Sequence, residues 1–185
     1  MNALLNMASG RYFTWLFDDD LYEPGFLQTA HDCLLQSDFP PAFFPSFRMM
    51  KVQERFQPSS IQPQPVIEFT GREFLSWYSA RKPKLASTIG LFDTVALKNT
   101  VGGVEQLCDA VIGVYCEYLF LVKSALLGRI VYMEAPFYVF RRHAESASEN
   151  NQDLENHRVA GQELVRRCGE VLRHPTLVDD CSVNL

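Results

Sequence analysis

The stretch Tyr12-Phe13-Thr14-Trp15-Leu16-Phe17-Asp18-Asp19-Asp20 decides the fold. Its first six residues are aromatic, β-branched or apolar, and the run lies between Gly10 and three acidic residues. A short apolar run with such boundaries predicts a strand, over residues 12–17, that is buried on both faces of a sheet. Sheets of this kind are covered by helices, so the stretch predicts an α/β protein with three carboxylates at the carboxyl end of a buried strand.

Helical and extended patterns alternate along the rest of the chain. We predict helices over residues 2–8, 24–35, 69–78, 110–127 and 153–172, and strands over residues 47–52, 88–93, 129–133 and 138–142. Six of the ten prolines lie between residues 36 and 66, where they argue against long regular elements and favour a long binding loop. The alternation favours an α/β fold with some antiparallel pairing in the middle.

The composition excludes several classes of protein. The chain has 185 residues, 47% of them hydrophobic, which suffices for one domain with a substantial core. A net charge of −5 provides no basic surface for nucleic acid. Five cysteines, an odd number without zinc-ligand spacing, favour a reducing compartment. The most apolar segment, residues 111–122, contains Glu117 and is too short to span a bilayer. We therefore expect a cytoplasmic protein, either free or attached peripherally to the inner face of the membrane.

The three adjacent carboxylates repel one another, and a bound cation is the simplest relief. Mg²⁺ prefers oxygen ligands and is usually held by one or two carboxylates together with substrate phosphates. The carboxyl ends of strands are also where open α/β sheets bind ligands. Asp18, Asp19 and Asp20 are therefore candidate metal ligands. The alternative is a solvated acidic turn that caps the helix predicted from Pro24.

The residues around the triplet match a known pattern. The matching positions, in chain order, are Asn2, Gly10, Tyr12, the acidic triplet and Pro24. Their order and spacing resemble the centre of a family 2 glycosyltransferase. The resemblance implies a GT-A fold, a Rossmann-like mixed sheet flanked by helices, in which Asp18, Asp19 and Asp20 hold Mg²⁺ or Mn²⁺ against the diphosphate of a nucleotide-sugar donor. Phe17 stands where the common form of the family has its first Asp, so Asp20 is the strongest single candidate.

A second block is similar to the carboxyl half of the same family. Its matching positions, in chain order, are Gly102-Gly103, Glu117, Gly128, Tyr132, Pro136-Phe137 and Phe140-Arg141-Arg142-His143. The resemblance implies that Glu117 is the catalytic base and that His143 lies at the metal. It also implies that Arg141, Arg142 and Asn2 contact the donor diphosphate. Cys116 stands where the family has a second acidic residue.

Each of these residues also has a plainer interpretation. A lone helix carboxylate such as Glu117 is common, and it could pair with Lys123 instead of acting as a base. Arg141 and Arg142 could be a basic cluster on a surface loop. Trp77 and Tyr78 could stack on an acceptor sugar, although core packing is the commoner role of such side chains.

The resemblance also predicts the domain organisation and the reaction. Family members carry further strands before the point where the likeness begins. We therefore expect residues 1–150 to be the carboxyl-side part of a GT-A domain, truncated at its N-terminal side, and residues 151–185 to be an amphipathic helix and tail. The expected activity is metal-dependent, inverting transfer of a sugar from a nucleotide-sugar to a saccharide or lipid-linked acceptor. The alternatives are a haloacid-dehalogenase-like phosphatase and a non-catalytic fragment or interaction module.

Overall fold

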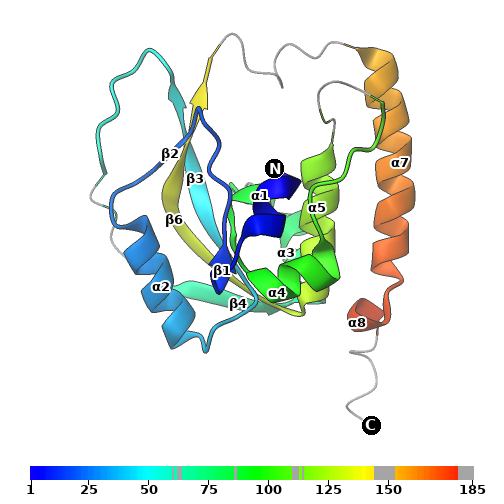
Figure 1. Cartoon of the computed structure of the whole chain (residues 1–185), viewed down its shortest axis with the longest axis horizontal. Coiled ribbons are helices and arrows are strands. Elements are labelled where there is room, and N and C mark those ends of the chain that lie inside the picture. The colour runs from blue at the N-terminus through cyan, green and yellow to red at the C-terminus, as the bar shows by residue number, and fades with distance from the viewer. Residues whose placement is uncertain are drawn as a thin grey trace.

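A six-stranded mixed sheet lies at the centre of the protein, with the strand order β1-β5-β3-β6-β2 and β4 paired to β6. The computed structural model describes residues 1–59, 61, 64–85, 87–109, 113, 115–143 and 153–178. The strands are β1 (Tyr12–Phe13), β2 (Leu21–Tyr22), β3 (Ala42–Lys51), β4 (Val66–Thr70), β5 (Leu91–Asp93) and β6 (Arg129–Arg142). The expected α/β class, with a mixed sheet flanked by helices, is confirmed (Figure 1).

Helices cover both faces of this sheet. They are α1 (Asn2–Met7), α2 (Phe26–Gln36), α3 (Gly71–Arg81), α4 (Thr94–Ala96), α5 (Cys116–Ser124), α7 (Leu154–Leu172) and α8 (Pro175–Val178). The described residues also form three short helical turns. Two are 3₁₀ turns, at Ser87–Ile89 and Ala125–Leu127, and the third is a π-helical turn at Leu97–Val101. In Figure 1, α2 covers one side of the sheet, whereas α5 and then α7 form successive layers on the other. None of the helices in the described part of the chain is long and apolar enough to cross a membrane.

The two hydrophobic cores follow from the alternation of side chains along β3. Phe43 packs with Phe26 and Leu34 of α2, whereas its neighbour Phe44 packs with Phe74 of α3 on the opposite face. Successive side chains of a strand point to opposite faces, so two adjacent fully buried phenylalanines require a sheet that is covered on both sides. The core on the α3 side also contains the central residues of α5.

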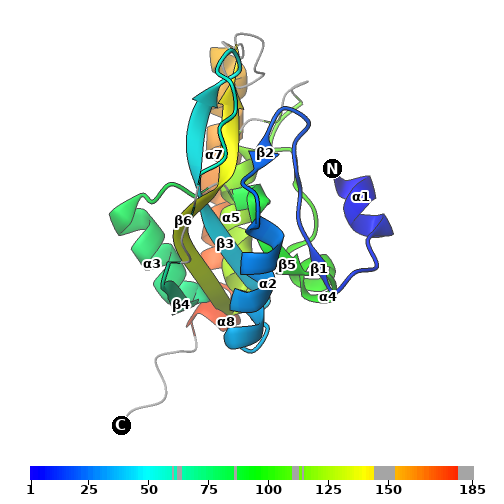
Figure 2. The same cartoon turned by 90° about the vertical axis from the view of Figure 1, so that its left-hand side faces the viewer.

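The parallel pair of β3 and β6 is the centre of the sheet. Its register runs from Ala42↔Ile130 to Lys51↔Arg142, with an irregularity after Pro45. The first half of β6 also pairs with β4 and its second half with β2, and the strand bends between the two halves (Figure 2). Our prediction of two separate strands, 129–133 and 138–142, was therefore wrong. The strand predicted over 47–52 is part of the longer strand β3, so the expectation that the prolines of 36–66 argue against long regular elements was also wrong. The prolines are tolerated because Pro45 and Pro136 lie at the irregularity, where regular pairing is interrupted.

The opening strand is shorter than its sequence suggests. Only Tyr12 and Phe13 belong to β1, which pairs with the three-residue strand β5. Trp15 is buried in the core, but Leu16 is 51% exposed, so the prediction of a strand over 12–17 that is covered on both faces was wrong. The apolar run marks burial of the segment, whereas the length of the strand is limited by its short partner.

Two helices begin later than the apolar pattern predicts, because capping and backbone conformation set their first residues. Thr70 and Glu73 form a capping box, with Thr70 Oγ accepting from the Glu73 N–H, so α3 begins at Gly71 and not at Phe69. Tyr115 has φ 59°, a left-handed conformation that stops α5 from extending towards residue 110. Residues 110–112 and 114 of the predicted helix 110–127 lie outside the described residues.

The C-terminal helix is confirmed in its limits but only partly in the face that it buries. Asp153 caps α7 by accepting from the N–H groups of Glu155 and Asn156. Ala160 is buried, and Leu164 and Cys168 pack beside it against α5. Three other apolar residues of this amphipathic helix, Leu154, Val165 and Leu172, are more than half exposed.

Gly71 is required where α3 starts against the turn after α5. A Cβ atom at this position would lie 1.9 Å from the carbonyl oxygen of Ala125. We predict that Gly71→Ala lowers the free energy of unfolding by about 1–3 kcal/mol, because a rigid backbone atom must move. The matched control is Gly161→Ala in α7, where the nearest atom would be 3.6 Å away and helix propensity favours alanine by about 1 kcal/mol. Urea unfolding measures both, and equal stability of the two variants would contradict the prediction.

Candidate functional site

The acidic triplet connects the opening extended segment to β2, and the structure gives its three members different environments. Asp18 is exposed to solvent. Asp19 is half-buried and faces His143, with 2.9 Å between Asp19 Oδ2 and His143 Nε2. Asp20 is only 4% exposed. The three carboxylates that the sequence treats as one group therefore do not converge on one point.

Asp20 ties the triplet to β6. The Tyr138 hydroxyl donates to Asp20 Oδ2 at 2.6 Å, and the Arg141 backbone N–H donates to Asp20 Oδ1 at 2.9 Å. Burial raises the pKa of Asp20, and these two hydrogen bonds oppose that rise. Burial, together with the hydrogen bond to Asp20, raises the pKa of Tyr138, so Tyr138 remains a donor. Asp20, the strongest single candidate from the sequence, thus has a donor on each carboxylate oxygen.

Asp19, Arg141 and His143 meet at the carboxyl end of β6. Arg141 Nε donates to the backbone carbonyl of Asp19, and this contact places the guanidinium beside the triplet. His143 follows the last residue of β6 and reaches the Asp19 carboxylate. The pairing of β2 with β6, in which Leu21 is opposite Val139, brings the two segments together.

Glu117 lies in the first turn of α5 and faces the same region. Its side chain is exposed to solvent. Desolvation by neighbouring residues, and next the negative charge of Asp20, raise the pKa of Glu117. The pairing with Lys123 that we had left open does not form, because Lys123 donates to Glu105. Glu117 also lines a cavity of about 220 Å³.

Asp19 and His143 are the residues at the triplet that could hold a metal ion. Among the described residues, no group of three or more His, Cys, Asp or Glu side chains is placed to hold a metal. Asp19 and His143 form the one Asp–His pair at the triplet, and Asp20 is engaged with Tyr138 and Arg141. Mg²⁺ and Mn²⁺ sites that act on phosphates are commonly completed by phosphate oxygens and water, so a two-ligand site is chemically adequate.

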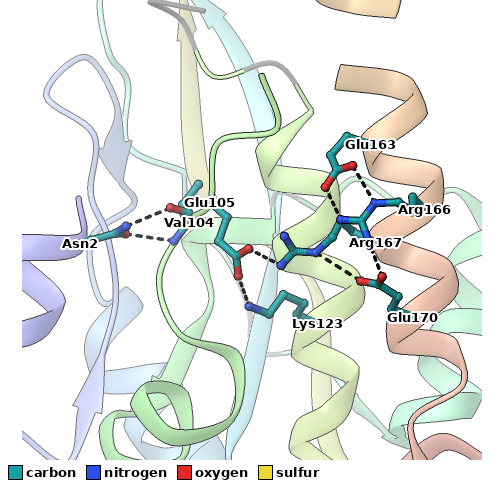
Figure 3. A network of polar contacts seen from close by, with 8 residues as sticks. All are labelled: Asn2, Val104, Glu105, Lys123, Glu163, Arg166, Arg167 and Glu170. Carbon is teal, nitrogen blue, oxygen red and sulfur yellow. Dashed lines mark hydrogen bonds and ion pairs between the residues drawn. The ribbon is translucent and has the colours of Figure 1, made fainter. Parts of the chain in front are cut away.

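Asn2 and Arg142 are the two remaining predicted diphosphate contacts. The Asn2 amide donates to the Val104 carbonyl at 2.9 Å and accepts from the Val104 N–H at 3.0 Å. It therefore holds the loop that follows Gly102 (Figure 3). Arg142 is exposed at the end of β6.

The loop after Gly102 is also joined to the two outer helices. Glu105 accepts from Lys123 of α5 and from Arg167 of α7 (Figure 3). Burial alone would raise the pKa of Glu105, but the two cations outweigh it, so the pKa is lowered. Arg167 also pairs with Glu170 on its own helix. This network fixes α5, and with it Glu117, between α7 and the sheet.

Two functional positions were not found from the sequence. Tyr138 lies in an apolar run, and nothing in its spacing indicates that its hydroxyl meets Asp20. Glu23 is buried beside the triplet, where it pairs with Arg48 at 2.8 Å and accepts from the Ser59 N–H at 2.9 Å. These bonds fix the segment after β3 near β2. A buried charge needs such partners, but only the fold brings them together.

The comparisons with known proteins concern the fold. The chain is similar to TarS of S. aureus, a glycosyltransferase. With the structure of TarS 1-349 in complex with UDP-GlcNAc, the TM-score is 0.65 and the identity 18%, over 96% of this chain and 50% of that chain. With the UDP complex of TarS 1-349, the TM-score is 0.61 and the identity 18%, over 96% and 48% of the two chains. The chain thus spans about half the length of these structures.

No protein-family model matches the sequence, and no curated protein matches it. At 18% identity the likeness to TarS establishes the fold. The protein therefore shares the mixed α/β fold of the corresponding half of TarS.

The raised pKa of Glu117 makes stability depend on pH in a defined direction. The folded state binds a proton more tightly at this site than the unfolded chain does, so stability is lost as pH rises from the ordinary glutamate value through the folded value. We predict that Glu117→Gln flattens this part of the stability curve, modestly because solvent reaches the carboxyl group. Urea unfolding between pH 4 and pH 8 measures the slope.

The matched control is Glu155→Gln on α7. A hydrogen bond from Arg158 lowers the pKa of Glu155, so its stabilising effect is lost as pH falls, which is the opposite sign. Parallel stability curves for the wild type and Glu117→Gln would contradict the environment assigned to Glu117.

Proposed function

We propose that the chain is a glycosyltransferase domain that transfers a sugar from a UDP-type nucleotide-sugar to a hydroxyl of a saccharide or lipid-linked acceptor. One observation carries the proposal: hydrogen bonds join the Asp19–Asp20 turn to Arg141 and His143 at the end of β6, and Glu117 of α5 lies near enough for the Asp20 charge to raise its pKa. The fold it shares with TarS, whose structures contain UDP-GlcNAc and UDP, supports this donor class.

The donor diphosphate would be held beside the carboxyl end of β6. Asp19 and His143 would bind Mg²⁺ or Mn²⁺, and Arg141 would add a positive charge next to the leaving group. The bound ion offsets the negative charge that develops on the departing nucleoside diphosphate. Asp20 positions Asp19 and Arg141 through its bonds to β6 and does not itself need to contact the ion.

Glu117 would accept the proton of the acceptor hydroxyl while that oxygen attacks the anomeric carbon. Its raised pKa makes the carboxylate a stronger base than an ordinary surface glutamate. Attack from the side opposite the leaving diphosphate gives inversion in a single displacement. Glu117 reaches the site from α5, whereas the diphosphate ligands belong to the triplet and β6, so base and leaving group approach from different elements.

The phosphatase alternative needs the carboxylates of Asp18 and Asp20 to face the same phosphoryl group. In the structure Asp18 is exposed, whereas Asp20 is buried with both oxygens bonded to β6. The geometry therefore favours the transferase over the phosphatase.

We predict that UDP binds in the presence of Mn²⁺ and that Asp19→Asn or His143→Ala weakens this binding by at least about tenfold, because each removes a proposed metal ligand. Isothermal titration calorimetry measures the affinity with and without Mn²⁺. The matched controls are Asp32→Asn and His31→Ala, which alter an exposed Asp–His pair on α2. A folded protein that binds UDP in neither condition would support the non-catalytic module instead.

We predict that Glu117→Gln lowers transfer by about 10²–10⁴-fold, the usual contribution of a positioned base, while Mn²⁺-dependent UDP binding is retained. UDP release from UDP-GlcNAc, measured with a panel of saccharide acceptors, gives the rate. Glu134→Gln, which changes an exposed glutamate of β6, should leave the rate unaltered. Transfer by Glu117→Gln at the wild-type rate would remove this residue as the base.

A further inference from the structure

The outer face of α7 carries a stripe of exposed apolar side chains. Leu154, Val165 and Leu172 are 82%, 73% and 51% exposed. Successive helical residues are turned by about 100°, so these three side chains lie within about 20° of one another along the helix. The opposite side of α7 packs on α5 through Ala160 and Leu164, and Figure 1 shows α7 outside α5. The stripe therefore faces away from the core.

The stripe ends at a largely apolar groove of about 480 Å³. The groove is lined by Arg72, Leu75 and Ser76 of α3, by Leu172 of α7, and by Leu177 and Val178 of α8. At the other end of the stripe, Leu154 is the most exposed large apolar side chain among the described residues. One end of α7 therefore has a projecting leucine, and the other end has an open groove.

A second copy of α7, laid antiparallel to the first, matches these two ends. With the two-fold axis beside residue 163, Leu154 of one copy lies opposite Leu172 of the other, and Val165 lies opposite Gly161. The six positions along this seam, 154, 158, 161, 165, 168 and 172, alternate in spacing between four and three residues, as in a coiled coil. Each Leu154 then reaches the groove of the other copy.

The charges at the two ends of α7 favour the antiparallel arrangement. The helix starts with Asp153 and Glu155, whereas Arg173 follows its last residue and Arg72 lines the groove. In the antiparallel pair Asp153 lies opposite Arg173, so the acidic end of each helix faces the arginines of the other copy. A parallel pair would place ends of like charge together.

Arg158 is the one charged residue of the seam, and it lies opposite Cys168. Its guanidinium already bonds Glu155 and Gln162 of its own helix, so it brings no unpaired charge to the pairing. The aliphatic part of an arginine can cover apolar surface while its charged group stays in water. A polar seam position of this kind fixes the register and lowers the affinity, so we expect a weak, reversible association.

We propose that the protein forms a two-fold symmetric dimer through antiparallel pairing of α7, with Leu154 of each copy seated in the groove beside Leu172 of the other. The same apolar stripe and groove serve both copies, as a two-fold interface requires. The proposal does not depend on the proposed sugar transfer. In Figure 1, α5 lies between α7 and the sheet, so the pairing does not involve the acidic triplet.

Sedimentation equilibrium of the full chain over a range of concentrations tests the dimer. The apparent mass of the wild type should rise from that of the monomer towards twice that value as concentration increases. Leu154→Lys places a cation beside the arginines of the other copy, and Leu172→Glu places an anion beside the acidic start of its α7. Each variant should raise the dissociation constant at least about tenfold.

A mixture of the two variants tests the register. In the antiparallel pair the mixed dimer brings the new cation against the new anion at one end and keeps the two leucines at the other. The mixture should therefore associate about as tightly as the wild type, whereas a parallel pair brings the two new charges together at neither end. The matched control is Val95→Lys, which changes an exposed apolar residue of α4 and should dimerise like the wild type. Circular dichroism checks that each variant keeps the wild-type helix content.

Four results would overturn the proposal. The first is a wild-type protein that stays monomeric up to about 1 mM, where even weak specific association is detected. The second is dimerisation of both single variants at wild-type strength, which would place the interface elsewhere. The third is a mixture of the variants that associates no better than either alone, which would exclude the antiparallel register. The fourth is a monomer that sediments with phospholipid vesicles, which would assign the stripe to a membrane surface.

Discussion

The candidate site depends on the attachment of one buried carboxylate to the last long strand. Asp20 accepts from the Tyr138 hydroxyl and from the Arg141 backbone N–H, so the acidic turn and β6 are held as one unit. This attachment places Asp19 opposite His143 and draws the Arg141 side chain to the Asp19 carbonyl. Burial would disfavour the Asp20 charge without these donors. Both donors belong to β6, so the strand holds them in place for the buried carboxylate.

A second set of contacts brings the other half of the site into place. Glu105 binds Lys123 of α5 and Arg167 of α7, and Asn2 holds the same loop through Val104. The helix that carries Glu117 is therefore fixed from its solvent side as well as from the core (Figure 3). The sheet holds the acidic turn against β6, whereas ion pairs between the loop after Gly102, α5 and α7 hold the helix that carries the proposed base.

Charge is distributed in a consistent way around this region. The two negative groups Glu117 and Asp20 lie close enough to interact, and their repulsion favours the binding of a proton or a cation. A positive group, the Arg141 guanidinium, lies beside the triplet, where it donates to the Asp19 carbonyl. Such a pattern suits the proposed function, in which an anionic diphosphate lies beside Arg141 and a neutral hydroxyl approaches Glu117.

Local sequence patterns were sufficient for the elements whose limits are set by neighbouring residues. The α/β class, the helix capped by Asp153 and the position of the acidic turn could all be predicted, because capping and apolar periodicity act over a few residues. Local patterns could not predict the short length of β1, the continuity of β6 across Pro136 or the separate environments of the three aspartates. Strand length depends on a partner distant in the chain, and the protonation and contacts of Asp20 depend on Tyr138, 118 residues away. The sequence by itself determined which residue types are available for the chemistry. Only the tertiary structure decided which of them meet, because hydrogen bonds and charge interactions depend on distance in space and not on order along the chain.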